Sequence, residues 1–276
     1  MPTNRQVYFS AVKQGVPREI VNFALQEVND YTFFDLVEHY DDEVIDYQSF
    51  VDSMNYYLGG GMIEYFFHKA YFLSQPFYVN KNVLIPRQET EQLVLDTIFK
   101  IKQMYGEQPI VIADVCTGSG VIGLSIAKEL RNNTYYLTDI DKEAIRVCKI
   151  NRHDIDSPNI NILKGDMLTP LIDGEIKLDV LVCNPPYISN EKTIDKKTWD
   201  NEPHIALLAK PATKFYEKIL SNYQKVMNRH FLMAFEIGED MEKPLRDLVK
   251  KYCPNATCSF EQDIYGKMRF LFIKQQ

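Results

Sequence analysis

The sequence lacks any hydrophobic run long enough to cross a membrane, and its first twenty residues hold four charged side chains without a continuous apolar segment. A membrane-spanning helix needs about 20 apolar residues, and a secretory signal has an apolar core of about 7 to 15. The sequence contains neither pattern. We therefore expect a cytoplasmic protein with no membrane partner.

Closely spaced cysteines are also missing. The five cysteines lie at positions 116, 148, 183, 253 and 258 and form no C-x-x-C pair. Structural zinc sites and redox motifs usually depend on such pairs, whereas an odd and scattered set is typical of reduced thiols. We expect neither a bound metal nor a disulfide framework.

Positive charge is scarce in one part of the chain. Residues 1–75 hold four Lys and Arg against eleven Asp and Glu, and the other residues hold 27 of each sign, so the net charge of -7 arises in the N-terminal part. An acidic surface repels the phosphate backbone of nucleic acids. We therefore expect no direct nucleic-acid partner.

The 276 residues exceed the usual size of a single core, and the apolar spacing divides them into three parts. Residues 1–69 show the spacing of helices and predict a small all-helical domain. Residues 70–86 carry two short apolar runs separated by Ser74-Gln75-Pro76, which predict a β-hairpin linker. Residues 87–276 form the third and largest part.

In this third part, predicted helices alternate with short apolar strands. The strands are expected at residues 110–115, 135–140, 160–164, 178–183, 231–237, 257–263 and 268–274. Such alternation predicts an α/β fold in which helices cover a seven-stranded, mostly parallel sheet. The last two strands are close enough in sequence to form a hairpin, so we expect one edge strand to run antiparallel.

A glycine-rich segment, DVCTGSG at residues 114–120, joins the first of these strands to a helix. In parallel sheets, ligands bind at the carboxyl ends of the strands, and glycine allows a ligand to approach the backbone closely. Gly118, Gly120 and the next glycine in the chain also satisfy G-x-G-x-x-G. Asp139 and Asp166 end the next two strands, where a carboxylate can accept hydrogen bonds from adenosine. These residues leave open whether the cofactor is NAD or S-adenosylmethionine.

The segment Asn184-Pro185-Pro186-Tyr187 favours S-adenosylmethionine. An amide nitrogen is a poor nucleophile because its lone pair is delocalised into the carbonyl, so an enzyme that methylates it must hold the NH2 group rigidly. The Asn184 side-chain oxygen and the Pro185 carbonyl can each accept one N–H, and Tyr187 can cover the planar group. The sequence therefore predicts methylation of a planar amide or amino nitrogen.

These motifs resemble those of the glutamine methyltransferases of peptide chain release factors, the HemK family. The resemblance rests on VLIPRQETE at residues 83–91, DVCTGSG at residues 114–120 and NPPY at residues 184–187, in this order. NPPY is shared with adenine methyltransferases that act on DNA, whereas VLIPRQETE is more specific. The resemblance implies a Rossmann-like class I methyltransferase fold, with S-adenosyl-L-methionine as cofactor and S-adenosyl-L-homocysteine as product.

The resemblance also implies which residues form the site. The cofactor-binding residues would be Asp114, Cys116, Thr117, Gly118, Ser119, Gly120, Asp139, Asp166, Met167 and Asn184. The substrate-binding and catalytic residues would be Asn184, Pro185, Pro186, Tyr187, Arg87 and Glu236, and Glu91 would wall the same pocket. Asp139 would hold the ribose, and Asp166 with Met167 would flank the adenine. No metal is implied.

The sequence departs from the family at two places. Cys116 stands where the family often has glycine, and we expect that this position does not require a positive φ. Residues 208–213 lack the glycine-rich, acidic segment that usually follows Leu207 in the family. The second departure concerns the local loop and leaves the predicted chemistry unchanged.

The leading hypothesis is a monomeric, cytoplasmic enzyme that methylates the glutamine of the Gly-Gly-Gln loop in peptide chain release factors and binds them through its helical domain. The same clamp could instead methylate an exocyclic amino group of a base in RNA or DNA, or a glutamine of another protein. NAD-dependent oxidoreduction through G-x-G-x-x-G and a non-catalytic binding role are further alternatives.

Overall fold

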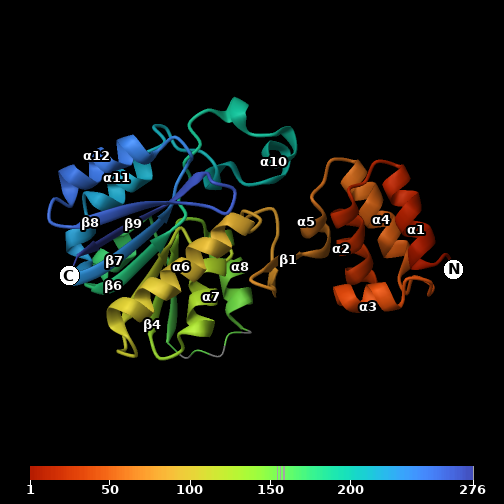
Figure 1. The fold of residues 1–276 in the computed structure, drawn as a ribbon, viewed down its shortest axis with the longest axis horizontal. Helices are drawn as coiled ribbons and strands as arrows, with labels where there is room; N and C mark the ends of the chain where they lie inside the picture. The colour runs from red at the N-terminus through yellow and green to blue at the C-terminus, as the bar shows by residue number, and fades with distance from the viewer. Residues whose placement is uncertain (154, 156, 158, 276) are drawn as a thin grey trace. The chain divides into compact units, whose positions relative to one another are not determined.

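The computed structural model describes residues 1–153, 155, 157 and 159–275, which form two compact units (Figure 1). The N-terminal unit comprises Met1–Lys69 together with Lys196–Asn201, and the larger unit comprises Ala70–Asp195 and Glu202–Gln276. Among the described residues, no helix combines the length and the apolar character that a membrane crossing requires.

The N-terminal unit is all-helical, as the sequence predicts. Its helices are α1 (Asn4–Lys13), α2 (Arg18–Asn29), α3 (Phe33–Glu38), α4 (Tyr47–Leu58), α5 (Ile63–Phe67) and α10 (Lys196–Asn201). Capping boxes begin two of them, with Thr3 and Gln6 at α1 and Thr32 and Asp35 at α3. The apolar face of α2 is buried at the centre of the unit, where Leu25 is fully inaccessible.

The helix α10 departs from the division expected from the sequence. Residues 196–201 are expected in the methyltransferase domain, but the structure groups them with the N-terminal helices. Lys197 Nζ lies 3.2 Å from the centre of the Tyr57 ring, a cation–π contact, and Asn201 Nδ2 donates to Gly60 O at 2.9 Å. These contacts depend on residues about 140 positions apart, so local spacing could not indicate them.

The hairpin of β1 (Lys69–Phe72) and β2 (Gln75–Tyr78) packs on the larger unit. Asn151 of α8 (Lys142–Arg152) accepts a hydrogen bond from Tyr78 N at 2.7 Å and donates one to Tyr78 O at 3.0 Å. Because its backbone is bonded in this way, most of the hairpin is part of the larger unit.

The larger unit is built on a seven-stranded sheet. Its strands are β3 (Val111–Val115), β4 (Thr134–Asp139), β5 (Ile160–Lys164), β6 (Leu178–Cys183), β7 (Met227–Glu236), β8 (Thr257–Gln262) and β9 (Met268–Gln275). The strand order is β5-β4-β3-β6-β7-β9-β8, and the first five strands in this order pair in parallel. The predicted Rossmann-like, mostly parallel sheet is therefore confirmed.

The expectation of an antiparallel edge strand is wrong in one detail. β9 runs antiparallel to both of its neighbours, β7 and β8, so the reversed strand is the penultimate one. The crossover after β7 carries β8 to the edge and leaves one strand position open. The hairpin then returns β9 into that position, where Phe270 and Ile273 are fully buried.

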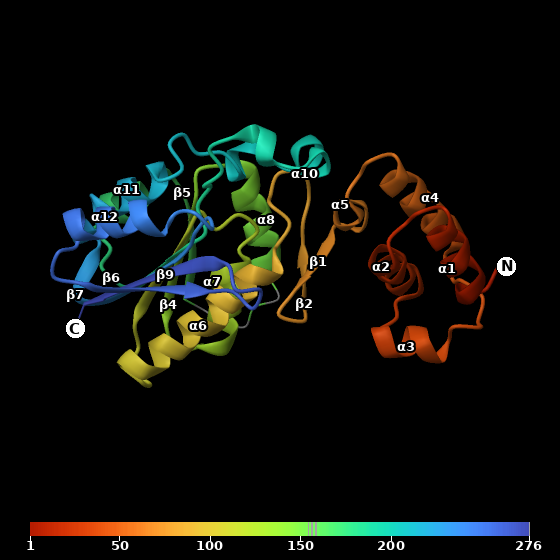
Figure 2. The same ribbon diagram turned by 45° about the horizontal axis from the view of Figure 1, so that its top comes forward.

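Helices cover both faces of this sheet, as Figure 2 shows. They are α6 (Gln88–Tyr105), α7 (Val121–Glu129) and α8 on one face, and α9 (Thr169–Asp173), α11 (Lys214–Leu220) and α12 (Glu242–Tyr252) on the other. Each face has its own apolar cluster, with Leu93 of α6 at the centre of one and Ile219 of α11 in the other. This packing holds the strand ends in fixed positions.

The helix that precedes β7 is short. α11 ends at Leu220, a 3-10 turn follows at Tyr223–Lys225, and β7 begins at Met227. Asn222 Nδ2 donates to Lys218 O at 3.0 Å and so takes a carbonyl that a continuing helix would use. The strand therefore starts earlier than apolar spacing indicates.

Candidate functional site

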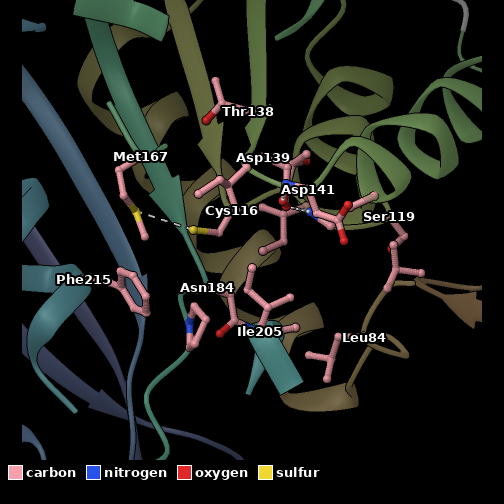
Figure 3. Close-up of a pocket in the computed structure, with 18 of the residues that line it drawn as sticks. Leu84, Cys116, Ser119, Thr138, Asp139, Asp141, Met167, Asn184, Ile205 and Phe215 are labelled. Atoms are coloured by element: carbon pink, nitrogen blue, oxygen red, sulfur yellow. Dashed lines mark hydrogen bonds between the residues drawn. The ribbon is translucent and has the colours of Figure 1, made fainter. Parts of the chain in front are cut away.

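A cavity of about 590 Å³ lies at the carboxyl ends of β3, β4 and β6. Figure 3 shows Met167 and Phe215 on one side of it and Ser119 and Asp141 on the other, with Asn184 between them. The predicted site residues that line it are Arg87, Cys116, Thr117, Gly118, Ser119, Asp139, Asp166, Met167, Asn184 and Pro186. Asp114, Gly120, Pro185, Tyr187 and Glu236 are not among the lining residues.

Asp114 supports the glycine-rich turn from beneath. It is 1% exposed, and its Oδ2 accepts hydrogen bonds from Thr117 Oγ1 at 2.6 Å and from Gly123 N at 2.9 Å. Burial raises the pKa of Asp114 to about 7, although these two donors favour the charged form. The carboxyl group thus fixes the turn that lines the cavity and is not itself among the lining residues.

The glycine-rich turn requires left-handed backbone at three residues. Gly118, Gly120 and Cys116 have φ values of 55°, 88° and 63°. The expectation that position 116 avoids a positive φ is therefore wrong, because the chain must turn sharply where β3 ends. An added Cβ at Gly118 would meet no atom within 4 Å, so the space above this residue is open to a ligand.

Asp139 lies at the end of β4, beside this turn. Its Oδ2 accepts from Gly118 N and its Oδ1 accepts from Asp141 N, both at 2.9 Å. Burial raises its pKa, while these backbone donors favour the charged form. Each oxygen keeps a lone pair after these bonds, so the carboxylate can also accept from the hydroxyls of a ribose.

Asp166 and Met167 follow β5 and form the opposite wall. Cys116 Sγ lies 3.6 Å from Met167 Sδ, as the dashed line in Figure 3 indicates. Asp166 forms an ion pair with Lys218 of α11, and Phe215 of the same helix also lines the cavity. Lys218 and Phe215 were not predicted, because the sequence indicates only the apolar core positions of that helix.

The predicted clamp follows β6. Asn184 Nδ2 donates to Thr90 Oγ1 at 3.4 Å, and Thr90 Oγ1 donates to Glu236 Oε2 at 2.6 Å. The Tyr187 hydroxyl is 3.3 Å from Glu236 Oε1, and burial raises the pKa values of both groups. Glu236 therefore acts on the clamp through its neighbours. Thr90 is a further site residue that the sequence did not indicate.

Arg87 reaches the cavity from the linker side. Its guanidinium pairs with the fully buried carboxylate of Glu202 at 2.5 Å, and Glu202 also accepts from Ile85 N at 3.0 Å. Glu91 does not line the cavity, because it accepts a hydrogen bond from Leu73 N at 2.8 Å. Glu202 thus fixes the segment that carries Arg87, and Glu91 fixes the hairpin.

These residues fit an S-adenosylmethionine molecule. Asp139 offers a carboxylate to the ribose, and Met167 and Phe215 provide apolar walls for the adenine. The open turn at Gly118 leaves space for the methionine part of the cofactor close to the backbone. Asn184 then borders the end of the cavity where a reacting nitrogen would enter. The same groups would suit part of a dinucleotide, so the cavity alone does not separate the two cofactors.

Similarity to known proteins decides between S-adenosylmethionine and a dinucleotide as the cofactor. The family described as methyltransferase small domain matches residues 94–201. The chain is 33% identical over 227 residues to the release factor glutamine methyltransferase of Bacillus anthracis. The matched region covers 81% of this chain and 80% of that protein. The chain belongs to the family of release factor glutamine methyltransferases. A second member, from Staphylococcus aureus, is 31% identical over 95% of this chain and 94% of its own length.

Solved structures agree on the fold. The chain is similar to a ribosomal protein L11 methylase from Lactobacillus delbrueckii subsp. bulgaricus, with a TM-score of 0.51 and 17% identity over 69% of this chain and 81% of that chain. It is also similar to the hMettl16 catalytic domain, with a TM-score of 0.55 and 16% identity over 72% of this chain and 74% of that chain. Family membership and this fold confirm a methyltransferase that uses S-adenosylmethionine, and they reject NAD-dependent oxidoreduction.

Proposed function

We propose that the protein transfers a methyl group from S-adenosylmethionine to the side-chain amide nitrogen of the glutamine in the Gly-Gly-Gln motif of peptide chain release factors. One observation carries this proposal: Asn184 lines the same cavity as Gly118 and Asp139. A planar amide held by the clamp would therefore lie beside the bound cofactor. The names of the relatives supply the release factor as the substrate.

The clamp suits an amide nucleophile. S-adenosylmethionine supplies an electrophilic methyl group on a sulfonium. Asn184 Oδ1 and the Pro185 carbonyl each accept one N–H of the substrate NH2, which orients the nitrogen lone pair toward that methyl. Tyr187 covers the planar group. The nitrogen loses a proton after it becomes cationic, so the attack itself does not need a dedicated base.

The remaining expectations complete the proposal. The N-terminal unit binds the release factor, and its excess of acidic residues disfavours RNA and DNA. The enzyme acts as a monomer in the cytoplasm. The clamp residues Asn184, Pro185, Pro186 and Tyr187 hold the substrate, Glu236 supports them through its hydrogen bond with Tyr187, and Arg87 lines the same cavity.

Mass spectrometry of an intact release factor, incubated with the protein and S-adenosylmethionine, tests the reaction. We expect one added methyl on the glutamine of the Gly-Gly-Gln peptide. Asn184→Ala should reduce turnover by about 10²- to 10³-fold, the usual effect of removing one polar group that positions the reacting atoms, and should change cofactor affinity far less.

Two other results would change the assignment. Equal losses of turnover and cofactor affinity in Asn184→Ala would reject the clamp role of this residue. Cofactor binding without methylation of the release factor would reject this substrate. It would leave a base amino group or another protein glutamine as the acceptor, and methylation of RNA, DNA or a cell extract would then distinguish these.

A further inference from the structure

Four side chains from three parts of the fold form one line of hydrogen bonds behind the clamp, and two of them, Asn184 and Tyr187, lie in the same segment after β6. Asn184 follows β6, Thr90 lies in the first turn of α6, and Glu236 ends β7. The donor–acceptor distances are 3.4 Å from Asn184 to Thr90, 2.6 Å from Thr90 to Glu236 and 3.3 Å from Tyr187 to Glu236. Thr90 and Glu236 are each 3% exposed, so water does not compete for these bonds.

Chemistry fixes the direction of each bond. An ionised carboxylate only accepts, so both hydroxyls must donate to Glu236. Burial raises the pKa of Glu236, whereas the hydrogen bond from Thr90 and the positive charge of Arg269 favour its charged form. The 2.6 Å separation from Thr90 lies in the range of a hydrogen bond to a charged oxygen. The single hydroxyl hydrogen of Thr90 is then committed to Glu236. Thr90 Oγ1 can therefore only accept from Asn184.

This direction determines how the Asn184 amide is turned. An asparagine side chain has nearly the same shape in two orientations related by exchange of its oxygen and nitrogen. Since Thr90 needs a donor, the nitrogen faces Thr90. The structure records no donor to Asn184 Oδ1 from any described residue, and Asn184 lines the cavity. The oxygen is thus left to accept a hydrogen bond from a substrate.

We propose that Thr90, oriented by Glu236, is a positioning residue that fixes the Asn184 oxygen toward the substrate and thereby selects a glutamine amide over a glutamate carboxylate. The two substrate side chains have nearly the same size, but only the amide offers N–H donors. The reverse orientation of Asn184 would present NH2 and would attract the carboxylate instead. This inference rests on the proposed function for the identity of the acceptor glutamine.

The chain offers matched variants for the test. Thr90→Val removes the hydroxyl and keeps the shape, and Thr90→Ser keeps the hydroxyl. Thr97→Val is the control, because Thr97 lies two turns further along α6, is fully buried, and its hydroxyl has no hydrogen-bond partner in the described structure. Each full-length variant is assayed for methylation of an intact release factor. S-adenosylmethionine binding and inhibition by the same factor with Glu at the acceptor position are also measured.

We expect Thr90→Val to lower kcat by about tenfold, as the loss of one buried orienting hydrogen bond implies, with cofactor affinity within about twofold of the wild type. The preference for the Gln factor over the Glu factor should fall by a similar ratio. Thr90→Ser and Thr97→Val should behave like the wild type. An unchanged Gln/Glu preference in Thr90→Val, or an equal loss in Thr90→Ser or Thr97→Val, would overturn the proposal.

A measurement without substrate separates this inference from the proposed function. NMR of the Asn184 side-chain amide should show contacts between its NH2 protons and the Thr90 side chain in the wild type and in Thr90→Ser. In Thr90→Val the protons should lose the chemical shift of a hydrogen-bonded amide. Contacts of this kind in a protein that fails to methylate the release factor would reject the substrate and keep the orientation of Asn184. Their absence from the wild type would reject the orientation itself.

Discussion

At the scale of single residues, Cys116 occupies a backbone conformation that normally belongs to glycine. Its φ of 63° lies in the left-handed region. This backbone conformation costs a residue with a Cβ atom roughly 1 to 2 kcal/mol. Cysteine is tolerated because its side chain contacts Met167 on the cavity wall.

Replacement of Cys116 tests this strain. We expect Cys116→Gly to have a free energy of unfolding about 1 kcal/mol higher than that of Cys116→Ala, because both lose the thiol but only alanine keeps the strained Cβ. Chemical denaturation of the two variants measures the difference. An alanine variant as stable as the glycine variant would mean that the left-handed backbone is not strained here.

Asp114 predicts a pH dependence of stability. Its pKa in the folded protein is about 7, above the ordinary value of 3.8, so the folded state keeps a proton that the unfolded chain releases. The stabilisation is complete below pH ~4 and is lost as the pH rises through ~7, with a slope approaching about -1.4 kcal/mol per pH unit.

Asp114→Asn isolates this contribution because it stays neutral at every pH. Its oxygen can replace Oδ2, and its NH2 group can replace Oδ1, which has no recorded partner. We expect the free energy of unfolding, measured by urea titration between pH 4 and 7, to fall less with pH in the variant than in the wild type. Parallel curves would show that Asp114 does not hold its proton.

Residue roles of this kind were only partly visible in the sequence. The motifs predicted the proposed clamp and the proposed cofactor turn because each follows an apolar strand, and residues of both line one cavity. Thr90 was missed because its role depends on Glu236, which is 146 residues away. Lys218 was missed for the same reason, since its partner Asp166 lies on another element. The φ of Cys116 depends on how sharply the chain turns, which residue identity alone does not reveal.

At the scale of elements, the contact between α7 and the sheet depends on Gly123. A Cβ at this position would lie 2.9 Å from Leu137 Cγ and 2.9 Å from Asp114 Cβ, closer than real contacts allow. The glycine therefore lets α7 approach β3 and β4, which keeps the helix start beside the cavity. It also donates to Asp114 through its backbone.

We expect Gly123→Ala to destabilise the protein by about 1 to 3 kcal/mol through overpacking, although alanine gains about 1 kcal/mol in helix propensity. S-adenosylmethionine affinity should fall as well, because the helix start moves. Ser125→Ala on the same helix is the control. Thermal unfolding and cofactor titration of both variants check this, and a stabilised Gly123→Ala would show that the helix can shift without loss.

The elements were the most predictable level. All seven strands lie close to the residue ranges expected from the sequence, and the largest difference is the start of β7 at Met227. One error occurred at the end of α11, where the Asn222 side chain donates to a backbone carbonyl that a longer helix would have used. The other concerned β9, which lies between β7 and β8 and not at the edge of the sheet. Both outcomes depend on tertiary packing, so local patterns do not contain them.

At the scale of the whole molecule, the connection after the clamp passes through both units. The chain leaves Tyr187 in the larger unit, forms α10 as part of the N-terminal unit, and returns at Glu202, which holds Arg87 and Ile85. The unit proposed to bind the release factor is thus covalently continuous with both sides of the proposed site. This arrangement offers a direct route by which binding of the protein substrate could order the clamp.

Asn201→Ala tests that route. The variant loses the hydrogen bond from Asn201 Nδ2 to Gly60 O, which attaches the end of α10 to the N-terminal helices. We expect KM for an intact release factor to rise by about three- to tenfold, the equivalent of one hydrogen bond, while S-adenosylmethionine affinity stays unchanged.

A matched control and a short substrate make this result specific. Asn228→Ala loses a bond from an exposed asparagine to Asp179 and should leave both constants unchanged. A Gly-Gly-Gln peptide too short to reach the N-terminal unit should be methylated equally by Asn201→Ala and the wild type, because it does not use that unit. An equal defect with the peptide would place the effect of Asn201 in the clamp loop itself, and attachment of α10 would then have no role in recognising the release factor.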